Sequence, residues 1–237
     1  MFTKSAAYYD ALYRSLGKDY SGETSRLHAL IRRHKLSSGM DLLDVACGTG
    51  KHLQELQQWY HVEGLDLDPL MLDIARQRCP EVAFHLADML NFQLGRKFDV
   101  ITCLFSSIGY VRTVPCLTES LSNMVDHLRP GGVLFIEPWL SPEVFQPGTA
   151  HALFVDEPEL KIARMNLSER QGDLSVLDFH YMVATAREIT HFTERHELAL
   201  FTDAEYRASF ECAGLQALYD EEGLMARGLY IGLYPLA

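Results

Sequence analysis

The sequence predicts an α/β protein with a mostly parallel, doubly wound sheet and a small antiparallel β-sheet inserted into it. From residue 41 onward, short apolar runs alternate with helical patterns, which implies right-handed β-α-β crossovers. The alternation stops between residues 138 and 200, where extended runs flank the turn Gln171-Gly172-Asp173, as antiparallel strands do. The first 40 residues carry aromatic and aliphatic side chains at helical spacing, so they are expected to be helical.

The parallel part is expected to contain five strands and three helices. The predicted strands cover residues 41–46, 62–66, 82–87, 98–104 and 133–137, and the predicted helices cover 51–59, a segment from 69 and 114–128. Asp68 can cap the second of these helices, because Pro69 follows it at the first helical position. The run Pro130-Gly131-Gly132 is expected to end the third helix.

The last hundred residues are expected to add the inserted sheet, one helix and two strands. Extended runs over 161–168, 174–183 and 189–200 predict three inserted strands. Thr202 and Glu205 have capping-box spacing, which predicts a helix that runs to about Ala213 and ends at Gly214. Residues 215–219 and 229–234 then read as the last two strands of the main sheet.

Composition excludes several classes of protein. The 237 residues are 48% apolar and 22% charged, as in ordinary globular domains. The net charge of −11 repels phosphate backbones, so no nucleic-acid partner is expected. No apolar run reaches about 18 residues and the N-terminus lacks a signal-peptide core, so no membrane partner is expected. Five cysteines without a CxxC pair fit free thiols in a cytoplasmic protein better than disulfides or zinc. No metal is expected, since no metal-ligand spacing such as HExxH occurs.

The first predicted strand runs into a small-residue turn, and a helix follows. The next strand ends at Asp66, 22 residues after Asp44, where a carboxylate can accept both ribose hydroxyls of a nucleoside. A dinucleotide site needs a third glycine where Lys51 stands, which argues against a nicotinamide-dependent oxidoreductase. The pattern D-x-A-x-G-x-G over residues 44–50 suits S-adenosylmethionine (SAM), which has no pyrophosphate. The alternative is that these glycines form an ordinary strand–helix turn without a cofactor.

Residues 43–50, 64–66, 87–89 and 128–132 together resemble the successive motifs of class I SAM-dependent methyltransferases. The resemblance implies a seven-stranded Rossmann-like sheet of order 3-2-1-4-5-7-6, with strand seven antiparallel. It implies that Asp66 binds the ribose and that Asp88-Met89 lie beside the adenine, although Asp88 could instead cap a turn. The cofactor-binding residues expected on this basis are Tyr9, Tyr20, Asp44, Ala46, Gly48, Gly50, Asp66, Leu67, Met71, Asp88, Met89 and Leu104.

A closer resemblance runs nearly end to end. Residues 17–20, 44–50, 94–98, 105–110, 137–139 and 227–229 are similar to the N,N-dimethyltransferases of dTDP-linked amino deoxysugars, of the desosamine and mycaminose pathway type. This implies N,N-dimethylation of a sugar amino group within antibiotic biosynthesis. Leu140 replaces the family's second tryptophan, and residues 223–228 depart from its Pro-x-Gly-Arg-Gly run. The identity of the sugar therefore stays open.

The chemistry needs few special groups. Methyl transfer from a sulfonium is an in-line displacement, for which an enzyme mainly supplies positioning and a dry site. Tyr110 follows the fourth strand of the parallel sheet and is the predicted catalytic residue, since its hydroxyl could orient the amine or accept its proton through water. The alternative is that Tyr110 only packs its loop. Related sugar methyltransferases can carry histidine there, which favours a polar role.

The substrate is expected to meet both the core and the inserted sheet. Arg227 is the best candidate for a diphosphate, because a guanidinium matches phosphate oxygens bidentately, whereas Arg164 also reads as a solvated strand residue. Trp139 could stack on a base or fill core. His180, His191 and His196 read as packing, hydrogen-bonding or interface residues, with the last two on opposite faces of a strand. The substrate-binding residues expected are Tyr13, Ser107, Tyr110, Trp139, Arg164 and Arg227.

Four regions result. Residues 1–39 are expected to form a helical lid, 40–137 the SAM-binding core, 138–200 an inserted β region for substrate or dimer contacts, and 201–237 the last helix and strands. Exposed strand edges of the insert make a homodimer plausible. Two alternatives remain: a SAM-dependent methyltransferase acting on a glycine-like amine or a hydroxyl, and a nucleoside-binding module without catalysis.

Overall fold

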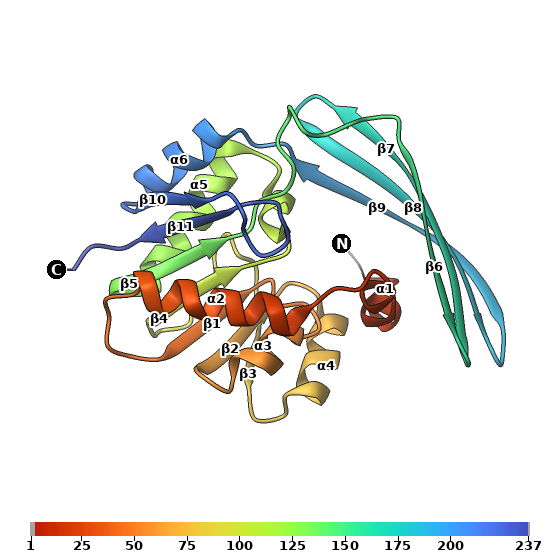
Figure 1. Ribbon diagram of the computed structural model, residues 1–237, viewed down its shortest axis with the longest axis horizontal. Helices are drawn as coiled ribbons and strands as arrows, with labels where there is room; N and C mark the ends of the chain where they lie inside the picture. Colours follow the sequence, from red (N-terminus) through yellow and green to blue (C-terminus); the bar gives the residue numbers. More distant parts are fainter. Residues whose placement is uncertain (1–2, 237) are drawn as a thin grey trace.

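The computed structural model describes residues 3–236 and contains two separate sheets (Figure 1). The main sheet has seven strands in the order β10-β11-β5-β4-β1-β2-β3. Only β11 runs antiparallel to its neighbours, β5 and β10, while the other pairs are parallel. The predicted order and its antiparallel seventh strand are thereby confirmed. The strands are β1 (Asp41–Val45), β2 (His61–Asp66), β3 (Ala83–Leu86), β4 (Phe98–Cys103), β5 (Leu128–Ile136), β10 (Gln216–Asp220) and β11 (Leu229–Leu233).

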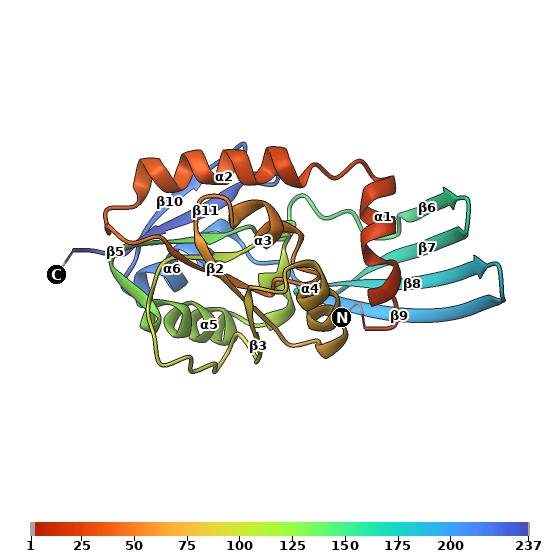
Figure 2. The ribbon, with the colours of Figure 1, turned by 90° about the horizontal axis from the view of Figure 1, so that it is seen from below.

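Helices cover both faces of the main sheet (Figure 2). Neighbouring residues of one strand point to opposite faces, and Leu42 and Leu43 of β1 accordingly belong to different apolar clusters. Leu42 packs in the cluster of α2, α3 and α4, whereas Leu43 packs in that of α5 and α6. The helical elements are η1 (Ala6–Tyr8), α1 (Tyr9–Ser15), α2 (Tyr20–His34), α3 (Lys51–Leu56), α4 (Pro69–Arg78), η2 (Ser107–Val111), α5 (Val114–Asp126) and α6 (Asp203–Cys212).

Two local predictions about helix termini are confirmed, and one break is placed differently. Asp68 caps α4 by accepting from the Leu70 amide, and Thr202 and Glu205 form a reciprocal capping box on α6. The predicted stop at Pro130-Gly131-Gly132 lies inside β5 instead, because α5 already ends at Asp126. The pairing of β5 with β4 shifts register there. A strand with a bulge can hold a proline and glycines that a regular strand would not.

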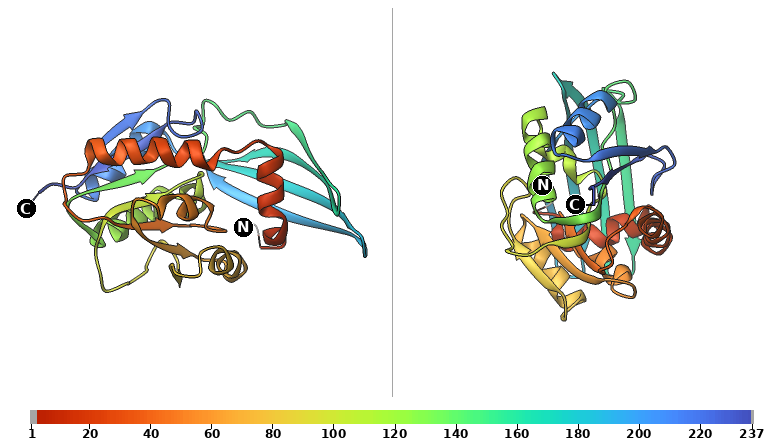
Figure 3. Two further views of the ribbon diagram at one scale, coloured as in Figure 1. Left: turned by 60° about the horizontal axis from the view of Figure 1, so that its bottom comes forward. Right: turned by 90° about the vertical axis from the view of Figure 1, so that its left-hand side faces the viewer.

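The second sheet has four antiparallel strands in the order β6-β7-β8-β9, one more than predicted. The missed strand is β6 (Ala150–Glu157), and the others are β7 (Leu160–Gln171), β8 (Leu174–Thr185) and β9 (Ile189–Ala199). In β6 only Leu153 and Val155 are buried, which leaves too short an alternating pattern to stand out. Its inner face packs on Ala11 and Leu12 of α1, and Figure 3 shows α1 beside this sheet.

The N-terminal segment ties the two sheets together. Glu194 of β9 accepts hydrogen bonds from the backbone of Lys4 (2.7 Å) and from the backbone and hydroxyl of Ser5 (3.0 and 2.6 Å). Asp10 of α1 accepts from the Thr49 hydroxyl at 2.8 Å and pairs with Arg78 of α4. Residues 3–19 therefore bridge the core and the second sheet, whereas α2 lies along the core. Residues 1 and 2 of the predicted lid and residue 237 lie outside the described chain.

Among residues 3–236, no helix combines the length and the apolar character that crossing a membrane requires.

Candidate active site

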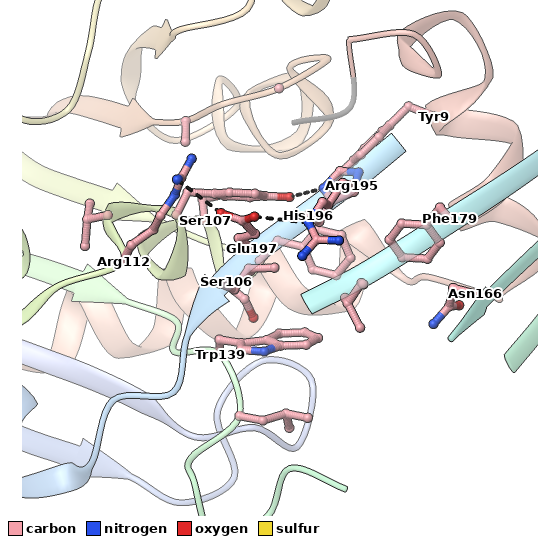
Figure 4. Close-up of a pocket in the computed structure, with 18 of the residues that line it drawn as sticks. Tyr9, Ser106, Ser107, Arg112, Trp139, Asn166, Phe179, Arg195, His196 and Glu197 are labelled. Atoms are coloured by element: carbon pink, nitrogen blue, oxygen red, sulfur yellow. Dashed lines mark hydrogen bonds and ion pairs between the residues drawn. The ribbon is translucent and has the colours of Figure 1, made fainter. Parts of the chain in front are cut away.

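A cavity of about 1290 Å³ lies between the carboxyl ends of the parallel strands and the inner face of the second sheet. Side chains of both sheets and of α1 line it. Figure 4 shows Phe179 and His196 of the second sheet around the same cavity as Ser106, Ser107 and Trp139 of the core. A pocket for one small ligand typically holds about 300–1,000 Å³, so this cavity has room for a cofactor and a second, large molecule.

The turn after β1 brings backbone close to the cavity. Ala46, Gly48 and Gly50 all have left-handed backbone, with φ of 60°, 55° and 75°. A methyl group built on Gly48 would meet nothing within 4 Å, while one on Gly50 would press on Ala75 at 3.2 Å. Gly48 therefore borders open space and Gly50 allows close packing of α3 on α4. Glycine adopts such φ values freely, so Ala46 alone of the three is strained, and strained backbone is concentrated at ligand sites.

Asp66, at the end of β2, is held in one orientation by two backbone amides. Its Oδ2 accepts from the Gly48 amide at 2.8 Å and its Oδ1 from the Asp68 amide at 2.9 Å. Burial raises the pKa of Asp66, and these two hydrogen bonds oppose that rise. Each carboxylate oxygen keeps a second lone pair, and Asp66 lines the cavity. The two oxygens can thus accept from the paired hydroxyls of a ribose.

One part of the cavity lining fits a purine. Leu67, Met71 and Met89 supply apolar walls there, and Asp88 supplies a carboxylate. Oδ1 of Asp88 accepts from the Leu90 amide at 3.0 Å, so Asp88 caps a turn and also lines the cavity. Apolar walls with a carboxylate acceptor among them suit an adenine and its exocyclic amine.

Four of the residues expected to bind the cofactor lie behind the cavity wall rather than on it: Tyr20, Asp44, Gly50 and Leu104. Asp44 is buried and accepts from the Thr102 hydroxyl at 2.7 Å, and burial raises its pKa to about 6. Tyr20 packs edge-on against the His52 ring, and Leu104 lies in the core. In this structure their contacts support the wall.

Glu137, at the end of β5, shapes the loop after β4. Its side chain is fully buried, and Oε2 accepts from the Phe105 amide at 2.6 Å. Phe105 and Ser106 both have left-handed backbone, with φ of 53° and 63°. The Ser106 hydroxyl donates to the Pro138 carbonyl at 2.8 Å and accepts from Arg227 at 3.2 Å. In the sequence Glu137 only opens the Glu137-Pro138-Trp139 run, and its role follows from this long-range contact.

Two arginines also line the cavity. The Arg227 guanidinium lies 5.2 Å from the centre of the Trp139 ring and 5.9 Å from that of Phe105. Arg164 of β7 lies 4.8 Å from the Phe179 ring, and its Nε and Nη1 have no hydrogen-bond partner among residues 3–236. Arg164 lines the cavity, so it is not the solvated strand residue that the sequence left as an alternative.

Tyr110 contacts the second sheet. Its hydroxyl is 2.6 Å from Nδ1 of His196 on β9, and both residues line the cavity. Burial raises the pKa of Tyr110 well above its ordinary value and lowers that of His196. His196 is buried and His191 is exposed, which confirms that they point to opposite faces of the strand.

Comparisons with known proteins agree with this arrangement. Residues 42–132 match a family described as "Methyltransferase domain". Two curated relatives are the dTDP-3-amino-3,6-dideoxy-alpha-D-glucopyranose N,N-dimethyltransferase of Streptomyces fradiae (42% identity, covering 96% of this chain and 90% of the relative) and the dTDP-4-amino-2,3,4,6-tetradeoxy-D-glucose N,N-dimethyltransferase of Saccharopolyspora spinosa (41%, 95% and 90%). This chain belongs to the family of amino-deoxysugar N,N-dimethyltransferases. The methyltransferase uses SAM as its cofactor.

Solved structures show the same fold as this methyltransferase. The crystal structure of DesVI from Streptomyces venezuelae superposes with a TM-score of 0.92 at 39% identity, covering 97% of this chain and 98% of DesVI. The SAM-bound structure of CalS10, an amino pentose methyltransferase of Micromonospora echinaspora involved in calicheamicin biosynthesis, gives 0.86 at 39% identity, covering 95% and 96%. The predicted fold class and enzyme class of the methyltransferase are confirmed.

The structure gathers most of the site residues predicted for the methyltransferase around one cavity. Those that line it are Tyr9, Tyr13, Ala46, Gly48, Asp66, Leu67, Met71, Asp88, Met89, Ser107, Tyr110, Trp139, Arg164 and Arg227. Lys18 lies behind the loop after β4, where it pairs with Glu23 at 2.8 Å and lies 3.9 Å from the centre of the Phe105 ring. Neither this position nor the contact of His196 with Tyr110 was expected from the sequence. Lys18 stands within a quoted motif, but no sequence signal marks His196.

Proposed function

We propose that this methyltransferase converts the amino group of a dTDP-linked amino deoxysugar into a dimethylamino group in two successive transfers from SAM. The observation that carries the proposal is the division of the cavity. Asp66, Asp88 and the glycine turn line it from the carboxyl ends of β1, β2 and β3, and Arg164 of β7 and Arg227 before β11 line it from other elements. The acidic group fits ribose hydroxyls and adenine, and the arginine group fits a diphosphate.

Bound SAM supplies a methyl group that is already electrophilic, because it is attached to a positive sulfur. The protein must therefore hold the acceptor amine in line, deprotonated and away from water. Tyr110 lines the cavity together with residues of both groups, and its hydroxyl is fixed by His196. Trp139 donates through Nε1 to the Ser175 hydroxyl at 2.8 Å, which sets its ring against Arg227. A base or sugar ring can pack on that indole.

Purified protein tests the proposal with isotope-labelled SAM and a panel of acceptors. The panel contains dTDP-linked 3-amino and 4-amino deoxysugars, the free amino sugars and glycine, since the relatives act on both amino positions. We expect mass spectrometry to find two added methyl groups on a nucleotide-linked sugar and none on the free sugar. Equal transfer to glycine or to a hydroxyl acceptor would favour the other substrate class. Cofactor binding without any transfer would favour a binding module.

Each region is proposed to have a separate role. Residues 3–19 act as the lid, because they bridge Thr49 and Arg78 of the core and Glu194 of the second sheet. The core binds SAM and the second sheet binds the nucleotide sugar. The outer face of that sheet exposes Phe154, Met165 and Met182, which supports the predicted homodimer, and light scattering at several protein concentrations tests it. All five cysteines are free, which supports the predicted cytoplasmic location.

A further inference from the structure

A chain of polar contacts leads from the cavity into the second sheet, through one hydrogen bond and one longer electrostatic contact. Tyr110 of η2 meets Nδ1 of His196 at 2.6 Å, and Nε2 of the same ring lies 3.8 Å from Oε2 of Glu194. Tyr110 and His196 are 86 residues apart in sequence, and the tertiary fold alone brings them together. His196 and Glu194 are both nearly inaccessible to solvent, at 1% and 7% exposure.

The charges around the ring fix its tautomer. Glu194 carries the negative charge beside Nε2, so the ring proton is favoured on Nε2 and the lone pair on Nδ1. The Tyr110 O–H then donates to Nδ1, and the lone pairs of its oxygen are left for the cavity. Burial alone would raise the pKa of Glu194, but the nearby His196 ring and the hydrogen bonds from Ser5 lower it overall. Glu194 therefore stays ionised at neutral pH.

A substrate amine reaches the enzyme mostly as an ammonium, since aliphatic amines bind a proton at neutral pH. It has no lone pair until that proton leaves. Burial raises the pKa of Tyr110 well above its ordinary value, so a free tyrosinate does not form to take the proton. Burial lowers the pKa of His196, against the opposing effect of Glu194, so the ring is neutral at pH 7 and can accept one.

We propose that Tyr110, His196 and Glu194 form a proton relay that deprotonates the substrate ammonium before methyl transfer. The proposal rests on the proposed function. An N–H bond of the ammonium breaks as its proton passes to the Tyr110 oxygen, and the Tyr110 O–H proton passes to Nδ1 of His196 in the same step. The amine gains its lone pair, Tyr110 is unchanged, and His196 becomes an imidazolium beside the Glu194 carboxylate. That proton leaves to solvent before the second methyl transfer.

His196 acts through Tyr110 and is thus a positioning residue with an added proton-accepting role. The other titratable groups near the pair include Arg164 of β7, Tyr9 and Tyr13 of α1, Tyr181 of β8 and Asp66 of β2. Arg164 disfavours a second positive charge, so the ring is neutral before the proton arrives. Once the proton has reached the ring, the Glu194 carboxylate stabilises the imidazolium. The Phe179 ring packs edge-on at 5.1 Å from the His196 ring and limits its rotation.

The decisive variant is His196→Asn. An asparagine Oδ1 can accept the Tyr110 hydrogen bond and so retain its position, but an amide cannot accept the proton. At pH 7 we expect kcat to fall by about 10²–10⁴, the usual contribution of acid–base catalysis. The rate of the variant should then rise about tenfold per pH unit toward the wild-type value, because only the free amine reacts. His191→Asn, on the exposed face of the same strand, is the matched control and should follow the wild-type profile.

Two further measurements separate a relay from a structural role. An aminooxy analogue of the sugar nucleotide carries an uncharged nitrogen at pH 7, so His196→Asn should methylate it at nearly the wild-type rate. Tyr110→Phe combined with His196→Asn should be no slower than Tyr110→Phe alone, since both changes interrupt one path.

A pH-independent loss in His196→Asn, or an equal loss on the aminooxy analogue, would overturn the relay while leaving the proposed function intact. A wild-type protein that methylates no amine would overturn both. Calorimetric SAM affinity and the thermal midpoint, each unchanged in the variant, show that folding does not account for the result.

Discussion

Arg227 offers the sharpest test of how the sugar nucleotide binds. The side chain is held by its neighbours, because its guanidinium hydrogen-bonds Ser106 and lies over the Trp139 ring. Little rotamer entropy is then lost on binding a phosphate. Hydrogen bonds to charged groups contribute about 1.5–3 kcal/mol each. Because Arg227 is only partly buried, we take about 2–4 kcal/mol as the contribution of a bidentate contact to the free energy of binding. This corresponds to roughly 30- to 1,000-fold in Kd.

The assay is calorimetric titration of the SAM-product complex with dTDP and with the dTDP-amino sugar. Arg227→Ala should raise the Kd of both ligands by that factor and leave the affinity for SAM unchanged. Arg227→Lys keeps the charge but cannot make a bidentate contact, so its loss of affinity should be smaller. Arg207→Ala, an exposed arginine on α6, is the matched control. Equal dTDP affinity in the wild type and Arg227→Ala would refute the assignment.

Three other predictions follow from single contacts. Asp66→Asn should weaken SAM by about 10- to 100-fold in calorimetry, since one charge-assisted hydrogen bond is lost, and an unchanged affinity would contradict the ribose assignment. The pKa of Asp44 is raised from 3.8 to about 6, because burial favours its neutral form. The contribution of Asp44 to the free energy of unfolding is therefore fully present below pH 3.8 and is lost as the pH rises through 6. Asp44→Asn should therefore gain up to about 3 kcal/mol relative to wild type between pH 4 and pH 8 in urea unfolding, and a constant difference would contradict this. Thr202→Ala should cost about 1 kcal/mol of unfolding free energy, while Thr202→Ser, which keeps the cap on Glu205, should cost less.

The parallel core could be predicted because its signals are local. Each strand is a short apolar run and each helix has its own cap, such as Asp68 on α4. The second sheet was harder, since β6 buries only Leu153 and Val155 against α1, and that partner lies about 140 residues earlier in the chain. Pro130 was wrongly expected to end a helix, because a bulge allows β5 to include it.

All six residues expected to bind the substrate line the cavity, whereas four of those expected to bind the cofactor lie behind its wall. Asp66 follows from a fixed spacing after the glycine turn, and its hydrogen bond to Gly48 is local to that motif. Asp44 shares the motif, but the structure places its side chain against Thr102 of β4, which spacing alone does not reveal. The partnership of Tyr110 with His196 depends on how the second sheet docks on the core, and no periodicity encodes that docking.

The central claim is that SAM lies where β1 meets α3, with its ribose on Asp66. Calorimetric titration of the wild-type protein with SAM and with its demethylated product tests this most directly. The account predicts one site per chain for both ligands, and no comparable binding of a nicotinamide dinucleotide. The absence of binding heat with either SAM or its product would contradict it.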